Sequence, residues 1–132
     1  MLHLPRAMPE RPPRDLGERT FTFACDVVRY CRELSKEPGV VRHIAWQLAD
    51  AATSAAANYQ EAKAAYSRRE FAAKMSVSLK ELRESNLWLR VVLACDIGRR
   101  EEPTRLQMEA NELVSIFTAS MRRLRPVPKR QA

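Results

Sequence analysis

Residue types on which catalytic and metal sites depend are scarce in this sequence. Its 132 residues include only 3 glycines, 2 histidines and 3 cysteines. It shows no Gly-rich phosphate loop and no nucleophile placed beside a base. Cys25, Cys31 and Cys95 have no paired spacing of the kind that binds zinc. We therefore predict a protein that is not an enzyme and has no catalytic residues, no metal and no other cofactor.

Long apolar runs are also missing. No stretch approaches the roughly 20 apolar residues with which a helix crosses a bilayer, so no membrane partner is expected. The first fifteen residues are rich in Pro and Arg and lack the apolar core of a secretory signal. On one helix, Cys25 and Cys31 would lie about 9 Å apart along the axis, too far for a disulfide. These features predict a cytoplasmic protein with reduced thiols.

The sequence does have many helix-forming residues with apolar positions recurring in steps of three and four. This spacing predicts helices over about 18–36, 40–66, 67–96 and 103–124. Pro38 and Gly39 separate the first two helices, because Pro cannot continue a helix and Gly permits the turn. Pro103 suits the first turn of the last helix.

Each predicted helix has one apolar face. In the first helix the face consists of Phe21, Ala24, Val28 and Cys31, widened by Phe23, Val27 and Tyr30. In the second helix it consists of Val41, Ala45, Leu48, Ala52, Ala55, Tyr59, Ala62 and Tyr66. In the third helix it consists of Phe71, Met75, Ser78, Leu82, Ser85, Leu89 and Val92. In the fourth helix it consists of Leu106, Ala110, Leu113, Phe117, Ser120 and Leu124. These are heptad-like seams, typical of helices that pack along their length.

The fold class follows from this pattern. Four amphipathic segments with short connections predict an all-α, antiparallel up-down four-helix bundle over residues 16–125. Ser67 and Glu70 form a capping box at the start of the third helix. A disordered Pro/Arg-rich segment, 1–15, and a basic tail, 126–132, are expected to flank the bundle. The alternative is an extended helical hairpin that exchanges helices with a second chain.

The third and fourth helices carry more apolar residues than one bundle core requires. Trp88 and Val91 lie off the seam of the third helix, and Ile116 and Met121 lie beside that of the fourth. Large exposed apolar patches usually mark partner surfaces. We therefore predict a homo-oligomer with Trp88, Val91, Ile116 and Met121 in its interface. The alternative is an irregular core that absorbs Trp88 from an angle.

Positive charge is concentrated in the second half of the chain. The net charge is +7, and residues 68–132 hold 14 basic and 8 acidic residues. An acidic partner such as RNA or DNA is therefore plausible, through phosphate contacts that arginine makes well. The alternative is a basic tail that only aids solubility. The candidate nucleic-acid contacts are Arg68, Arg69, Arg99, Arg100, Arg122, Arg123, Arg125, Lys129 and Arg130.

Polar residues form rows beside the apolar seams of the second and third helices. We predict that Asn58, Glu61 and Glu84 form a structural polar network, since half-buried polar groups need partners. The alternative hypothesis is a catalytic site, because paired carboxylates in a helical bundle resemble those of di-iron proteins. Those sites use Glu-x-x-His pairs, and the sequence contains none.

Two motifs in this region resemble a known family. Residues 54–62, SAAANYQEA, are similar to the S-x-x-A-N-Y-x-E-A signature of the 23S rRNA intervening-sequence (S23) proteins. Residues 79–89, LKELRESNLWL, are similar to the K-E-x-x-E-x-x-x-W-L element of that family. The spacing of Arg69-Glu70-Phe71 and Lys74-Met75-Ser76 between them also resembles the family. The resemblance covers roughly residues 16–124.

This resemblance implies a four-helix bundle that assembles as a homopentamer and has no established enzymatic activity. Related accessory variability proteins of diversity-generating retroelements are basic pentamers that bind nucleic acid and a reverse transcriptase. The expected function is thus that of a non-enzymatic, oligomeric accessory protein that binds RNA or DNA by its backbone, with a reverse transcriptase as a candidate protein partner. A structural or protein-interaction scaffold with incidental basic charge is the alternative.

Overall fold

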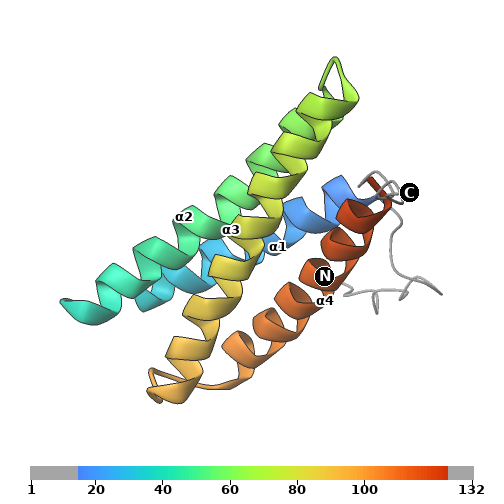
Figure 1. Cartoon of the computed structure of the whole chain (residues 1–132). Helices are drawn as coiled ribbons and strands as arrows, with labels where there is room; N and C mark the ends of the chain where they lie inside the picture. Colours follow the sequence, from blue (N-terminus) through green and yellow to red (C-terminus); the bar gives the residue numbers. More distant parts are fainter. Residues whose placement is uncertain (1–14, 125–132) are drawn as a thin grey trace, which may run out of the picture.

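The computed structural model describes residues 15–124, and these form four helices with no strand among them (Figure 1). The helices are α1 (Leu16–Leu34), α2 (Val40–Lys63), α3 (Arg68–Ala94) and α4 (Glu101–Leu124). The prediction of an all-α chain with four helices is confirmed. The disordered segment was predicted for residues 1–15, of which 1–14 lie outside the described residues, while Asp15 caps α1. The tail predicted for 126–132 also lies outside them.

The helix ends follow local signals in the sequence. Asp15 Oδ1 accepts a hydrogen bond from the Gly17 backbone nitrogen at 2.9 Å, so α1 begins two residues before the predicted Glu18. At the start of α3, the predicted cap is present, because Ser67 Oγ accepts from the Glu70 nitrogen at 3.1 Å. Both caps satisfy amide groups that the first helical turn leaves without a backbone partner.

α2 ends earlier than predicted. The helix ends at Lys63, and Tyr66, predicted as a core residue, is 98% exposed. This prediction was wrong because the helix stops one turn before the apolar repeat does. After α3, Asp96 and Gly98 adopt φ angles of 53° and 66°, a left-handed conformation that ends a helix.

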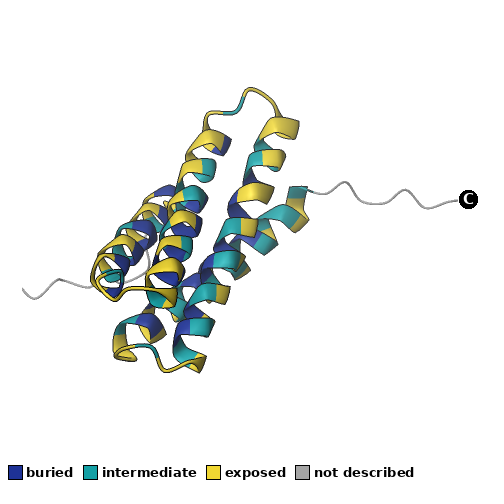
Figure 2. Ribbon diagram, turned by 90° about the vertical axis from the view of Figure 1, so that its left-hand side faces the viewer, coloured by how far each residue is buried: buried dark blue, intermediate teal, exposed yellow. Residues whose placement is uncertain are grey.

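All four helices contribute to one core, and each buries the side that faces its neighbours (Figure 2). α2 and α3 pack along most of their length, and of the four helix pairs that adjoin each other, α1 and α4 have the least extensive contact. The turn between α2 and α3 projects past the ends of the other two helices (Figure 1). The largest fully buried side chains include Phe23, Val27, Leu48, Leu82, Leu89, Leu113 and Phe117.

α1 buries a different stripe from the one that its apolar residues suggested. Phe23 and Val27, predicted only to widen the core face, are 1% and 0% exposed. Phe21 and Val28, predicted at its centre, are 52% and 40% exposed, so that placement was wrong. The inward face is centred on Thr20, whose hydroxyl is satisfied by the backbone oxygen of Leu16 at 2.7 Å. Hydropathy alone does not identify this face, because a polar residue lies at its centre.

The predicted seams of α2, α3 and α4 are otherwise confirmed. The alanines at 45, 52 and 55 are fully buried, and small side chains there allow close approach of α3. Ser78 on α3 reaches across and donates a buried hydrogen bond of 2.7 Å to the carbonyl of Ala55 on α2. Tyr59 packs edge-on against Phe117 with ring centroids 5.5 Å apart.

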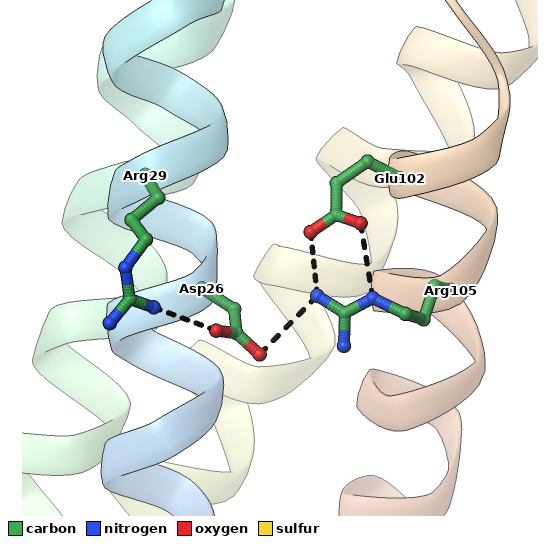
Figure 3. Close-up of polar contacts among 4 residues, drawn as sticks. All are labelled: Asp26, Arg29, Glu102 and Arg105. Atoms are coloured by element: carbon green, nitrogen blue, oxygen red, sulfur yellow. Dashed lines mark hydrogen bonds and ion pairs between the residues drawn. The ribbon is translucent and has the colours of Figure 1, made fainter. Parts of the chain in front are cut away.

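Polar bridges join α1 to α4, where apolar contact is thinnest. Arg19 pairs with Glu109 at 2.8 Å and with Glu112 at 2.9 Å. Further along, Arg105 of α4 joins Asp26 of α1, at 3.3 Å, to Glu102 of its own helix, at 2.6 Å (Figure 3). Charged side chains therefore tie the first helix to the last.

Candidate nucleic-acid and subunit-contact surfaces

A groove with three cationic side chains runs between α3 and α4, and we call it the basic groove. Its volume is about 470 Å³, and it is lined by Ser76, Leu79, Lys80, Arg83, Thr118, Met121 and Arg122. The α3 members 76, 80 and 83 are spaced by four and three residues, so they lie on one side of that helix. The groove is thus fixed by two rigid helices.

The basic groove has no internal compensation for its positive charge. Among the lining residues none is acidic, and within residues 15–124 none of Lys80, Arg83 and Arg122 takes part in an ion pair. By contrast, Arg19 and Arg105 are each held by two carboxylates. Three cations beside the hydroxyls of a serine and a threonine provide hydrogen-bond donors that suit an anion such as a phosphate.

The predicted nucleic-acid contacts do not form one patch. Arg68 and Arg69 stand in the first turn of α3, while Arg99 and Arg100 lie beyond its other end. The 27 residues of α3 separate these pairs by about 40 Å. Arg100 is engaged in the turn, donating to the carbonyl of Leu93 at 3.0 Å and pairing with Asp96 at 3.3 Å.

At the end of α4, Arg122 lines the basic groove, and Arg123 donates to Ser120 Oγ at 3.3 Å. The predicted contacts Arg125, Lys129 and Arg130 lie outside the described residues. Lys80 and Arg83 are absent from the predicted set, which favours clusters at helix ends. Their spacing of four and three residues from Ser76 places all three on one face of α3, and this spacing could have indicated the groove.

The outer side of α2 and α3 gathers the polar residues of the two motifs. Asn58 donates to the carbonyl and hydroxyl of Ser54, at 2.9 and 3.2 Å. Glu61 pairs with Lys74 at 2.6 Å, and Glu84 accepts from Trp88 Nε1 at 3.1 Å. The structure therefore places Asn58, Glu61 and Glu84 on one face, each with a partner of its own.

Two carboxylates on this face lack a cation. Glu81 and Glu84 form no ion pair with any residue between 15 and 124. Partial burial and then the neighbouring charge of Glu84 raise the pKa of Glu81. The charge of Lys80 opposes this rise only in part, so the face carries negative charge that no ion pair within the described residues neutralises.

The predicted interface residues are less exposed than expected. Trp88, Val91 and Met121 are half-buried and pack against the core, and Ile116 is half-buried as well. For Trp88 this matches the alternative in which the core absorbs it from an angle. Trp46 has a larger free surface at 62% exposure, and sequence reasoning missed it because it stands alone beside the α2 seam.

Trp46 belongs to a second groove, on the outer side of α1 and α2, which we call the apolar groove. It consists of two adjoining hollows of about 240 and 420 Å³ that share Val28. Phe21 lines one hollow and Trp46 the other. Their exposure gives the bundle an apolar surface far from the basic groove, on different helices.

Other kinds of site find no support in the described residues. Between residues 15 and 124, no three side chains of His, Cys, Asp or Glu converge in a way that would hold a metal ion. No helix in that range has both the length and the apolarity to cross a bilayer. Cys25, Cys31 and Cys95 are free thiols, half-buried, buried and exposed respectively.

Comparison with known proteins gives a family match and similar solved structures. A family model described as 23S rRNA-intervening sequence protein matches residues 15–119. A crystal structure from Bacteroides thetaiotaomicron, of a protein with unknown function from the S23 ribosomal protein family, superposes with a TM-score of 0.73. The two sequences are 25% identical, and the match covers 80% of this chain and 97% of that one. No curated protein matches the chain.

Proposed function

Because the chain belongs to the 23S rRNA-intervening sequence protein family, we propose that it is a non-enzymatic accessory protein that binds nucleic acid as a homo-oligomer. Its subunit is an antiparallel up-down bundle, and the ring expected from the family resemblance has five copies. The ligand is the phosphate backbone of RNA or DNA. A reverse transcriptase is a candidate protein partner on the same resemblance.

The observation that carries this proposal is the basic groove. Lys80, Arg83 and Arg122 converge there with no carboxylate among the lining residues, whereas Arg19 and Arg105 are each neutralised by two carboxylates within the bundle. The groove offers no exposed aromatic ring for base stacking, so contact is to phosphate rather than to bases. Repeating the groove around an oligomer multiplies a weak attraction through effective concentration.

The test is binding of a fluorescently labelled single-stranded RNA of mixed sequence, followed by anisotropy. The variant K80Q/R83Q/R122Q should weaken binding about tenfold or more, and it should lower the slope of log affinity against log salt by about one for each cation that contacted a phosphate. The matched control is K36Q/R42Q/K63Q, which removes the same charge at three exposed positions outside the groove.

Two results would contradict the proposal. One is wild-type protein that leaves the RNA anisotropy unchanged even at roughly 50 mM salt, where phosphate contacts are strong. The other is equal weakening by the groove variant and the control, because that would mean that net charge rather than the groove attracts the RNA. Retained helical circular dichroism in both variants ensures that folded proteins are compared.

A protein-interaction scaffold is the second candidate function. The exposed Trp46 and Phe21 favour it, since large free apolar side chains mark partner surfaces. In that case the groove variant would bind RNA as weakly as the wild type does, whereas a substitution at Trp46 would abolish capture of a protein partner.

A further inference from the structure

The apolar groove has the geometry of an unfilled helix-packing seam. On α1 it presents positions 21, 25, 28 and 32, and on α2 positions 46, 49, 53 and 56. Both sets alternate in steps of three and four, which is the spacing that receives a third helix. Its large apolar side chains point away from the core, since Trp46, Phe21 and Val28 are 62%, 52% and 40% exposed.

The groove has a small-residue floor between larger side chains. Ala24, Ala49 and Ala56 line it, with Phe21 toward one end and Trp46 toward the other. Small residues at these positions let a helix approach closely, and the two aromatic rings can then pack on its sides. The shape therefore fits a helix better than it fits an extended segment.

The edge of the groove is basic. Arg29 and Arg32 are among its lining residues, and no lining residue within the described range is acidic. Arg32 forms no ion pair with residues 15–124, and Arg29 pairs only with Asp26, at 2.8 Å. A helix that fills the groove would meet this positive charge beside its apolar centre.

A matching stripe lies on the outer side of α3 in the same chain. Positions 77, 81, 84, 88 and 91 step by four and three residues, so they form one line along the helix. Val77, Trp88 and Val91 make it apolar: Val77 is 40% exposed, while Trp88 and Val91 are half-buried against the core and present only part of their surface here. Glu81 and Glu84 make it acidic, and both lack a cation within the described chain.

We propose that the apolar groove of one chain receives the α3 stripe of a second copy, with Arg32 facing Glu84. The inference rests on the homo-oligomer of the proposed function and assigns its contact. Charge complementarity selects a second copy as the occupant, because Arg32 on one surface and Glu81 and Glu84 on the other form no ion pair within the described chain. Each chain uses its groove for one neighbour and its stripe for the other, so the contact is head-to-tail, which is the kind of contact from which closed rings are built.

The test is a charge swap followed by light scattering during gel filtration. R32E and E84R should each raise the dissociation constant of the oligomer about tenfold or more, because each puts like charges face to face. The double variant R32E/E84R should restore the wild-type mass. In this variant the groove becomes negative at position 32 and the stripe becomes positive at position 84, so every contact between copies again joins opposite charges. The rescue is therefore expected for any number of copies.

An apolar variant and a control complete the experiment. W46D should dissociate the oligomer while retaining the helical circular dichroism of the wild type, since Trp46 contributes to no core contact in one chain. M108E should leave the mass unchanged, because Met108 is 68% exposed and lies on neither surface. Oligomers of normal mass in R32E, E84R and W46D would overturn the proposal.

Other outcomes separate this contact from the proposed function. A double variant R32E/E84R that stays dissociated would overturn the pairing of Arg32 with Glu84 even if each single variant is monomeric. A monomeric wild type at micromolar concentration would overturn both the contact and the oligomer, while RNA anisotropy would still report on the basic groove. An R32E variant that is monomeric supports the contact. If this monomer still binds RNA, although more weakly than the oligomer, the proposed nucleic-acid binding stands as well.

Discussion

Arg19 shows how one charged side chain can act as part of a core. Its side chain is only 13% exposed. Hydrogen bonding to Glu109 raises the pKa of Arg19 most, burial opposes this rise, and hydrogen bonding to Glu112 adds to it. The fork geometry of a guanidinium allows it to engage two carboxylates from successive turns of α4. Arg19 thereby adds polar contacts between α1 and α4, whose packing is the least extensive of the adjoining helix pairs.

Removing this bridge has a specific expected cost. Arg19→Met keeps the aliphatic stem but leaves two carboxylates without a partner, so the free energy of unfolding should fall by about 1 kcal/mol, the upper end for a partly exposed pair. Urea denaturation measures this value. Lys36→Met, which breaks an exposed pair with Glu33, should change stability by less than about 0.5 kcal/mol. Equal effects would contradict the bridging role.

A second residue-scale expectation concerns Cys31. Burial raises the pKa of its thiol to about 12. The unfolded chain releases this proton at lower pH than the folded chain does, so the free energy of unfolding falls as pH rises between the two pKa values. The loss is up to about 1.4 kcal/mol per pH unit. Urea denaturation of wild type and Cys31→Ala between about pH 8 and 10 should show a shallower decline in the variant.

At the scale of elements, the sequence predicted how many helices form and most of their buried faces. Continuous 3–4 spacing over α3 and α4 placed Leu82, Leu89 and Phe117 correctly in the core. The prediction failed where a polar residue occupies the core, as Thr20 does on α1, and where an apolar repeat outlasts its helix, as at Tyr66. Hydropathy cannot distinguish a residue that faces a neighbouring helix from one that faces a neighbouring chain.

The candidate site was less predictable, because it depends on which helix sides face each other. Charge asymmetry indicated the second half of the chain and included Arg122. The pairing of Arg122 with Lys80 and Arg83 requires the register between α3 and α4, which no single-helix pattern contains. The apolar groove was missed for the same reason, since Phe21 and Trp46 belong to different helices.

The two faces of α1 can be distinguished by substitution. Phe23→Ala should lower the free energy of unfolding by about 3–5 kcal/mol, because it empties a filled core position. Phe21→Ala should leave the unfolding of a monomeric background such as R32E nearly unchanged, since that side chain is half exposed. Thermal unfolding of both variants in that background tests this. A large loss from Phe21→Ala would mean that Phe21 packs in the core after all.

The start of α3 provides a further prediction at this scale. Ser67→Ala removes the acceptor for the Glu70 amide and should cost about 0.5–2 kcal/mol. Ser76→Ala is the matched change within the same helix and, away from any cap, should cost less. Chemical denaturation that ranks the two in the opposite order would show that the cap does not stabilise α3.

At the scale of the whole molecule, the surface is divided by charge and polarity among helix pairs. The α3–α4 side is basic, the α2–α3 side acidic and the α1–α2 side apolar with a basic edge. Such a division suits a subunit that contacts its own copies on two sides and leaves a third for an anionic ligand. The α1–α4 side is neutralised internally by Arg19 and Arg105.

The proposed contact with the phosphate backbone has a consequence for ligand preference. Phosphate contacts carry no sequence information, so poly(A), poly(U) and single-stranded DNA of equal length should compete with the labelled RNA at midpoints within about threefold of one another. Competition anisotropy measures these midpoints. A strong preference for one homopolymer would indicate direct reading of bases, for which the basic groove provides no stacking surface.

The packing of each helix against its neighbour in sequence also bears on how fast the chain folds. Contacts between neighbours in sequence close short loops, and chains dominated by such contacts fold within microseconds to milliseconds. The contacts between α2 and α3, including the buried alanines and the Ser78 hydrogen bond, join helices that follow each other in the chain. The salt bridges of Arg19 and Arg105 join the two ends of the fold and therefore form only once α4 has been synthesised. During translation the apolar side chains of α1–α3 that α4 covers stay open to water until that moment, and this is the interval in which a nascent chain is most exposed to aggregation.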